Sequence, residues 1–115
     1  MRRGEIWEVN LEPVRGSEAD KRRPAVIVSN DAANAATERT RRGVVTVVPV
    51  TSNVARLRSF QVLMPKARTG LKRDSKAQAE QVRSVAVERI GRRLGHVPRS
   101  LMTEIDDALR LHLAL

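Results

Sequence analysis

An arginine and a threonine at the ends of two apolar runs could act together on a phosphate group. Arg23 precedes the run 24–28, and Thr51 follows the run 44–50. A guanidinium offers a rigid fork of donors to phosphate oxygens, and a hydroxyl can donate to a developing negative charge. If the two runs pair as antiparallel strands with their apolar stretches in register, Arg23 lies beside Thr51 where both strands leave the core.

Side chains that support other kinds of catalysis are scarce. The chain has no cysteine and two histidines, His96 and His112, neither of which has metal-ligand spacing to a neighbour. No P-loop, dinucleotide fingerprint or G-x-S-x-G motif is present, and Asp106 and Asp107 point different ways on a helix. Arginine and hydroxyl chemistry remains, and RNA suits it because RNA supplies its own 2′-hydroxyl nucleophile. We therefore expect no metal and no cofactor.

The two apolar segments, 22–30 and 44–53, are predicted to form the centre of the fold. Both are short and rich in β-branched residues, and their odd and even positions are both apolar, which favours strands buried on both faces. The matching register places Ala25 opposite Pro49 and Ile27 opposite Val47. The connection between the segments is long enough to allow a parallel crossover as well.

By themselves, Arg23 and Thr51 do not establish a catalytic site. Arg23 fits a solvated strand entry, and Thr51 fits a turn former at the end of a strand. The residues alone favour this plainer interpretation, and the catalytic one needs further support.

The other elements follow from hydrophobic periodicity and turn residues. Residues 5–11 alternate as a half-buried strand with Trp7, Val9 and Leu11 on one face, and 12–21 reads as a hairpin loop. We expect a helical turn at 31–36, a basic loop at 37–43, and strands at 60–64, 75–85 and 91–97. The strand 75–85 is expected to have one solvent-exposed (wet) side. Ser100 is the expected N-cap of the long final helix, whose end at Leu113-Ala114-Leu115 is expected to dock on the body of the protein.

Composition indicates a single domain spanning residues 1–115, large enough for its own core. The absence of cysteine is consistent with a reducing compartment. No apolar stretch has the length of a signal peptide core or a membrane span, so we expect a soluble protein of the cytoplasm.

Positive charge is concentrated in the middle of the chain. The net charge is +9, and the segment from Arg39 to Arg73 holds nine basic residues and no acidic one. This local excess favours a polyanionic partner. Nucleic acid is the first expectation and an acidic protein segment the second.

Several motifs in order resemble those of the MazF/PemK-like toxins of bacterial toxin–antitoxin systems. The matching residues are Gly4-Glu5-Ile6-Trp7, Gly16-Ser17-Glu18, Arg23-Pro24 with the strand that follows to Asn30, Val48-Pro49-Val50-Thr51-Ser52, Asp74-Ser75, Glu80-Gln81-Val82-Arg83 and the Leu-rich final helix. Each motif is short, but their order and spacing cover essentially the whole chain. The sequence departs from the pattern at Lys76-Ala77-Gln78, where many relatives are more apolar.

The resemblance implies a mainly β (α+β) fold: a small SH3-like or CcdB-like β-barrel with short helices and a C-terminal helix, forming a homodimer. It implies a metal-independent, sequence-specific endoribonuclease that cleaves single-stranded RNA through the 2′-hydroxyl. The products would carry a 2′,3′-cyclic phosphate and a 5′-hydroxyl, and cleavage would inhibit translation and growth. The family's catalytic arginine and threonine fall on Arg23 and Thr51. The implied partner is a MazE-like antitoxin whose acidic tail covers the basic face.

Further residues near the two strand ends are expected to bind the RNA substrate. Glu18 would orient RNA or the arginine, cations would contact phosphates, and polar side chains would contact bases or the backbone. The expected substrate-binding residues are Glu18, Lys21, Arg22, Ser52, Asn53, Arg56, Arg58 and Gln81. Because Trp7 and Phe60 are the only aromatic residues, hydrogen bonds and charge should contribute more than base stacking.

Two other functions stay open at this stage. One is a non-catalytic CcdB-like gyrase poison, although that mode depends on a tryptophan-containing C-terminal tail and this chain ends in Leu-Ala-Leu. The other is an SH3-like module that binds nucleic acid without cleaving it. Strand scission separates the ribonuclease from the module, whose binding would weaken steeply with salt.

Overall fold

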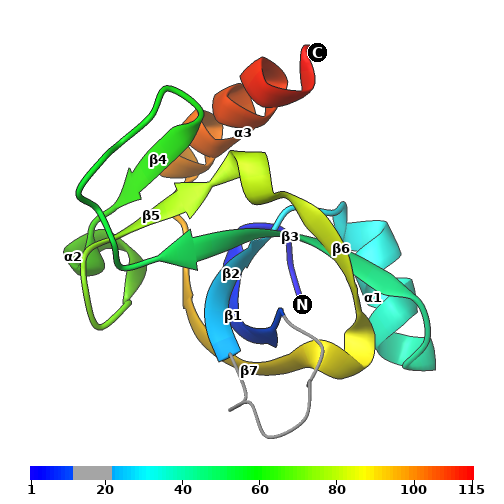
Figure 1. The fold of residues 1–115 in the computed structure, drawn as a ribbon. Coiled ribbons are helices and arrows are strands. Elements are labelled where there is room, and N and C mark those ends of the chain that lie inside the picture. The colour runs from blue at the N-terminus through cyan, green and yellow to red at the C-terminus, as the bar shows by residue number, and fades with distance from the viewer. Residues whose placement is uncertain (12–21) are drawn as a thin grey trace, which may run out of the picture.

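A computed structural model describes residues 1–11 and 22–115 and shows a mainly β chain with short helices and a long C-terminal helix (Figure 1). This is the predicted fold class. The strands are β1 (Glu5–Asn10), β2 (Arg22–Ile27), β3 (Val44–Thr51), β4 (Gln61–Met64), β5 (Ser75–Gln78), β6 (Arg83–Ala86) and β7 (Ile90–His96). The helices are α1 (Asp31–Thr40), α2 (Lys66–Thr69) and α3 (Arg99–Leu113), with 3₁₀ turns η1 (Ala79–Gln81) and η2 (Val87–Arg89).

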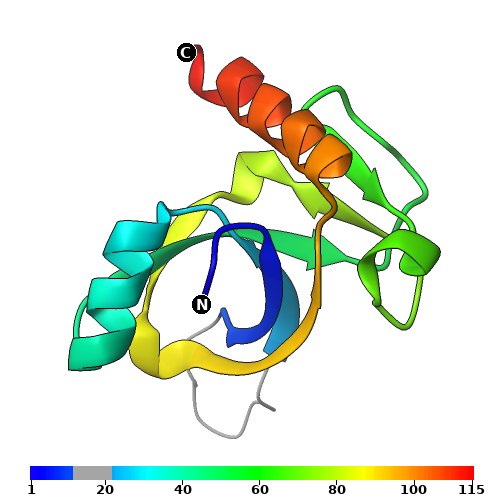
Figure 2. The same ribbon diagram turned by 180° about the vertical axis from the view of Figure 1, so that it is seen from behind.

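The strands of the described residues form one antiparallel sheet that curls strongly but does not close. Its order is β4-β5-β3-β2-β1-β7, and β6 pairs with β3 beside this path. Figures 1 and 2 show β1, β2, β3, β6 and β7 arranged around a common interior, with α3 lying on the side of β4 and β5. This architecture agrees with the predicted small β-barrel fold class, and among the described strands no pairing joins β7 to β6.

The central pair of strands has the predicted register. β2 and β3 are antiparallel, with Ala25 opposite Pro49 and Ile27 opposite Val47, which excludes the parallel crossover. The recorded pairing ends at Ala25 and Pro49. Proline has no N–H to donate to a ladder, and Pro24 and Pro49 lie at this point on the two strands. Beyond it, β3 pairs with β5 instead, through Val50 and Thr51.

The predicted strand 75–85 is divided in two. β5 and β6 pair with the same edge of β3, but the 3₁₀ turn η1 separates them. The expected wet side of this segment is also wrong, because Lys76 and Ala77 are both buried. The turn η1 lets the segment 75–86 pair with β3 on both sides of the bend in the sheet.

The core consists of two apolar clusters on opposite faces of the sheet. One packs strands β3, β4 and β5 against α3, and it includes Ile6, which was expected on the exposed face of β1. The other lies inside the curl and includes Val9 and Leu11, as the alternation of β1 predicted. β1 is thus buried on both faces at Ile6 and Val9, so the half-buried interpretation was incomplete.

Helices α1 and α3 differ from the sequence predictions at their ends. α1 extends to Thr40, four residues further than the predicted turn, and the Asn30 side chain caps it by accepting from Ala33 N at 2.8 Å. α3 begins after Pro98 with no side-chain cap, and Ser100 Oγ instead accepts from Arg68 at 2.7 Å.

The C-terminal leucines do not dock within the described chain. Leu113 is 49% exposed and Leu115 is 85% exposed, whereas Leu101 and Ile105 are buried against the sheet. The apolar stripe of α3 therefore continues past the body of the protein and leaves an exposed apolar end.

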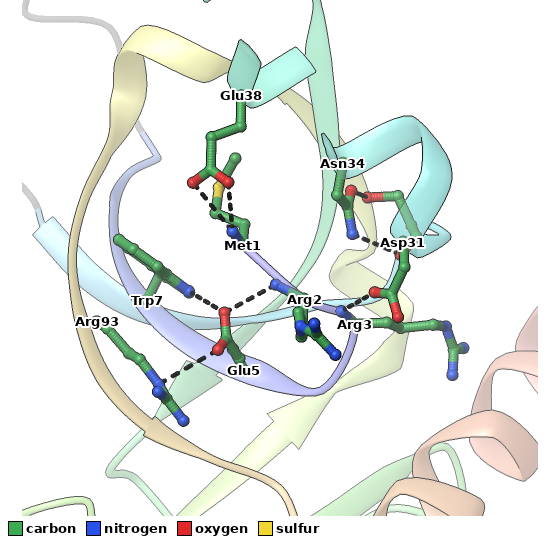
Figure 3. Close-up of polar contacts among 10 residues, drawn as sticks. Met1, Arg2, Arg3, Glu5, Trp7, Asp31, Asn34, Glu38 and Arg93 are labelled. Atoms are coloured by element: carbon green, nitrogen blue, oxygen red, sulfur yellow. Dashed lines mark hydrogen bonds and ion pairs between the residues drawn. The ribbon is translucent and has the colours of Figure 1, made fainter. Parts of the chain in front are cut away.

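A polar network centred on Glu5 joins β1, β7 and the N-terminal residues (Figure 3). The Glu5 carboxylate accepts from Arg2 N at 2.8 Å and from Trp7 Nε1 at 3.1 Å, and it lies 3.5 Å from Arg93 Nε. Burial raises the pKa of Glu5, but these hydrogen bonds, Arg93 and the Met1 ammonium group together lower that pKa below its ordinary value of 4.5. The network therefore favours the ionised carboxylate in the folded protein.

We expect Glu5→Gln to destabilise the fold by about 1–2 kcal/mol at pH 7, since hydrogen bonds to a charged group are lost. A lowered pKa stabilises the fold above the unfolded value, and this contribution disappears as the pH falls through the folded value. Urea unfolding at pH 7 and at pH 3 measures both effects. The difference between variant and wild type should shrink in acid. Glu104→Gln, at an exposed position on α3, is the control, and a pH-independent difference for Glu5→Gln would contradict this account.

Candidate nucleic-acid site

A cavity of about 480 Å³ opens where the β2–β3 ladder stops. Its walls come from β1, the start of β2, the end of β3, the segment from α2 to β5, and strand β7. The described residues that line it are Glu8, Arg22, Arg23, Pro24, Val50, Ser52, Gly70, Leu71, Lys72, Arg73, Ser75, Arg92 and Leu94. The volume is in the range of small-molecule and cofactor sites, and the lining mixes cations, hydroxyls and apolar side chains.

The charge of this cavity is strongly positive. Five cations line it, and Glu8 is the one acid in its described lining. Glu8 lies 3.5 Å from Arg22 NH1 and 3.9 Å from Arg92 Nε. Arg23 pairs with Val9 through the backbone, and its exposed guanidinium has no hydrogen bond or ion pair with a described residue, so it is available to an anion. The arrangement favours phosphate groups over neutral ligands.

Thr51 lies at the edge of this site rather than in its lining. It is the Cα partner of Lys76 on β5, and its Oγ1 accepts from Asn53 N at 3.2 Å. Among the described residues, the neighbouring hydroxyl of Ser52 lines the cavity with Arg23. Ser52 lies in the bend that directly follows β3, of which Thr51 is the last residue. The structure thus brings Arg22, Arg23 and Ser52 together and holds Thr51 beside them.

The other expected substrate-binding residues lie outside the cavity or outside the described chain. Asn53, Arg56 and Arg58 are exposed on the β3–β4 connection, and Gln81 ends η1. None of these four lines the cavity. Glu18 and Lys21 lie outside the described residues.

Sequence reasoning missed Lys72, Arg73, Arg92 and Ser75 as parts of the site. Lys72 and Arg73 belong to the acid-free stretch that indicated a polyanion, but they were not among the expected substrate-binding residues. Nothing in the sequence around Arg92 indicated a role in the site, because it is the pairing of β7 with β1 that brings this residue to the cavity. The order of the strands in the sheet decides which segments far apart in the sequence lie close together.

A close backbone contact holds one wall of the cavity in place. A Cβ atom built on Gly95 of β7 would lie 2.1 Å from the carbonyl oxygen of Thr69, and Gly70 follows with φ at +81°. Only glycine permits β7 and the end of α2 to approach this closely. The contact fixes the segment that leads into Lys72 and Arg73.

No helix of residues 1–11 and 22–115 is long and apolar enough to cross a membrane. In the same residues, no three His, Asp or Glu side chains gather as ligands of a metal ion would.

The fold and the cavity define a class: a small, mainly β protein with a basic cavity at the ends of two central strands, suited to a phosphate-bearing polymer. The family model described as "PemK-like, MazF-like toxin of type II toxin-antitoxin system" matches residues 2–113. The chain therefore belongs to this toxin family, as the ordered motifs indicated.

Relatives named as endoribonucleases match the chain over its full length. It is 59% identical over 115 residues to endoribonuclease MazF9 of Mycobacterium tuberculosis, covering 100% of this chain and 98% of the relative. It is 30% identical to endoribonuclease EndoA of Bacillus subtilis, covering 100% of this chain and 96% of EndoA. A MazE–MazF crystal structure from Deinococcus radiodurans superposes with a TM-score of 0.80 at 26% identity, covering 100% of this chain and 96% of that one. These matches confirm the predicted family, enzyme class and fold class.

We expect Gly95→Ala to destabilise the protein by about 2–3 kcal/mol or more, because the new methyl group would overlap the backbone of Thr69. Gly91→Ala on the same strand is the matched variant. Its Cβ would lie 3.2 Å from Glu8 Oε1 and 3.3 Å from Glu8 O, which calls for a smaller adjustment. Thermal unfolding compares the two. Equal stability of the two variants would contradict the close contact.

Proposed function

We propose that this chain is a toxin that cleaves single-stranded RNA at specific sequences and so inhibits translation and growth. The RNA 2′-oxygen attacks the adjacent phosphorus, the bond from phosphorus to the 5′-oxygen breaks, and the products carry a 2′,3′-cyclic phosphate and a 5′-hydroxyl. The observation that supports this most is the Arg23 guanidinium, which has no side-chain partner among the described residues, in a basic cavity of a chain that belongs to this toxin family. No metal ion is required, since the nucleophile belongs to the substrate.

Arg23 is assigned to stabilise the charge of the phosphorane. A guanidinium stays protonated in proteins, which makes it a strong donor to phosphate oxygens and a weak base. Its exposure and lack of a described partner leave its donors available to the substrate. Stabilisation of charge that develops in the transition state is the largest catalytic contribution a single donor makes.

Thr51 is assigned to hold a phosphate oxygen or the leaving group. Its Oγ1 accepts a hydrogen bond from Asn53 N, so the hydroxyl is oriented while its own proton remains available to donate. β3 bends away from β2 next to Arg23, which leaves room for a phosphate between the two strand ends. Ser52, in the lining, supplies a second hydroxyl at the same strand end.

The remaining cations bind the RNA backbone. Arg22, Lys72, Arg73 and Arg92 line the cavity, and Arg56 and Arg58 extend the positive surface along the β3–β4 connection. Asn53 and Gln81 contribute polar contacts to bases or backbone, and Glu18 and Lys21 belong to the same substrate set. Phosphate contacts position the strand, and hydrogen bonds to base edges give specificity.

The proposed assembly is a cytoplasmic homodimer held inactive by an acidic MazE-like antitoxin. Crystal structures titled as MazF with MazE and as an endoribonuclease with its cognate antitoxin resemble this chain. Its basic cavity suits an acidic segment, and the exposed apolar end of α3, with Leu113 and Leu115, suits a protein interface.

Arg23→Ala and Thr51→Ala should each lower RNA cleavage by about 100-fold or more, the loss expected when one transition-state donor is removed. Single-stranded RNA is incubated with each protein in EDTA, and fragments are resolved on a sequencing gel. Arg110→Ala and Thr103→Ala on α3 are controls of the same residue types and should keep wild-type rates. Full activity in both Arg23→Ala and Thr51→Ala would overturn the site. Binding without scission by the wild type would instead support a non-catalytic module.

Salt dependence should separate the cavity cations from the basic residues near α1. Affinity for a fully 2′-O-methylated RNA is measured by fluorescence anisotropy between low and high salt. Each phosphate contact in single-stranded RNA contributes about −0.7 to the slope of log affinity against log salt. Arg73→Ala should reduce the slope by about that amount. Arg39→Ala, in the last turn of α1, should leave it unchanged, and an equal change in both variants would contradict the cavity as the RNA site.

A further inference from the structure

Lys76 occupies an unusual position beside Thr51. On β5 it is the Cα partner of Thr51 on one side and of Leu63 on the other. Directly opposed residues of antiparallel strands point to the same face, with Cβ atoms about 4.5–5.5 Å apart. Thr51, Lys76 and Leu63 therefore form one row across three strands, on the face opposite the core row of Val50, Ala77 and Val62.

The Lys76 side chain is buried although its face of the sheet is not part of the core. Lys76 is 8% exposed, whereas Leu63 in the same row is 44% exposed. The Lys76 ammonium donates to the carbonyl oxygen of Arg56, in the middle of the β3–β4 connection. No described carboxylate forms an ion pair with it. A buried cation needs a partner, and here the backbone of the connection provides it.

Polar contacts restrain the β3–β4 connection near each of its ends, and the bond from Lys76 restrains it in between. At its far end, Arg58 N donates to Gln61 Oε1 at 3.1 Å, and Gln61 Nε2 donates to Glu80 Oε2 at 2.7 Å. At its near end, Asn53 N donates to Thr51 Oγ1 at 3.2 Å. Within the connection, Ala55 N donates to Asn53 Oδ1 at 3.2 Å. Residues 52–59 are exposed, and among the described contacts the bond from Lys76 is the one that joins their middle to β5.

We propose that Lys76 is a positioning residue that fixes the β3–β4 connection over β5 and so holds Arg56 and Arg58 in place for the RNA backbone. This inference rests on the proposed ribonuclease function. Lys76 acts through the connection, and its ammonium is already engaged with the Arg56 carbonyl rather than with substrate. Loss of the bond should free the connection without disturbing the apolar core beneath β5.

Lys76→Met tests the proposal because methionine has a similar length, fits a site beside Leu63 and has no donor. Hydrogen exchange of the full chain without RNA should become about tenfold faster for amides in residues 53–59, the change expected when a hydrogen bond to a charged group is lost. The melting temperature should not fall, since an apolar side chain replaces a buried cation. KM for RNA cleavage should rise about fivefold while kcat stays within about twofold, because phosphate contacts are misplaced and the reacting groups are not.

Two further variants keep the result interpretable. Lys76→Arg keeps a cationic donor and should restore slow exchange in residues 53–59. Arg110→Met removes one exposed cation from α3 and should change neither exchange nor KM. The proposal is overturned if exchange in 53–59 is unchanged in Lys76→Met, if exchange accelerates throughout the chain with a lower melting temperature, or if kcat falls while KM is unchanged. Failure of the wild type to cleave RNA would refute the proposed function, whereas the exchange measurement would still decide whether Lys76 restrains the connection.

Discussion

The interruption of the β2–β3 ladder is the constraint on which the site depends. Two strands that pair well through Ala25, Val26 and Ile27 stop pairing beside Pro24 and Pro49, which have no N–H to donate. β3 then continues by pairing with β5. The strands separate where Arg23 precedes one apolar run and Thr51 and Ser52 follow the other, and the cavity lies at this point.

The distribution of charge around this opening suits the polyanionic ligands proposed above. Arg22, Arg23, Lys72, Arg73 and Arg92 come from separate segments of the chain, and Glu8 offsets only part of their charge. Like charges gathered in one cavity repel each other, and a phosphate polymer relieves that repulsion while it releases its own counterions. The same physics suits an acidic antitoxin segment, so substrate and inhibitor would compete for one surface.

The walls of the cavity are held by contacts that tolerate little change. Gly95 allows β7 to meet the backbone of Thr69, and this contact fixes the segment that carries Lys72 and Arg73. On the other side of β3, the connection that carries Arg56 and Arg58 is exposed and depends on a few polar bonds to Lys76 and Gln61. A rigid cavity wall, with a lightly restrained connection outside the cavity, suits a site that must hold a phosphate firmly and still admit a flexible strand.

The sequence by itself determined the central strands, the register they would have if antiparallel, and the family, because β-branched apolar runs, prolines and ordered motifs are local properties of the chain. It also indicated Arg23 as a cation at a strand end. The structure excluded the parallel crossover that the sequence had left open. Only the tertiary structure decided that Arg92 and Arg73 share a cavity with Arg23, that Ser52 rather than Thr51 lines it, and that the segment 75–85 breaks at η1. It also left Leu113 exposed, where periodicity indicated docking. These features depend on which strands pair and where the sheet bends, and pairing between distant segments leaves no pattern in either segment alone.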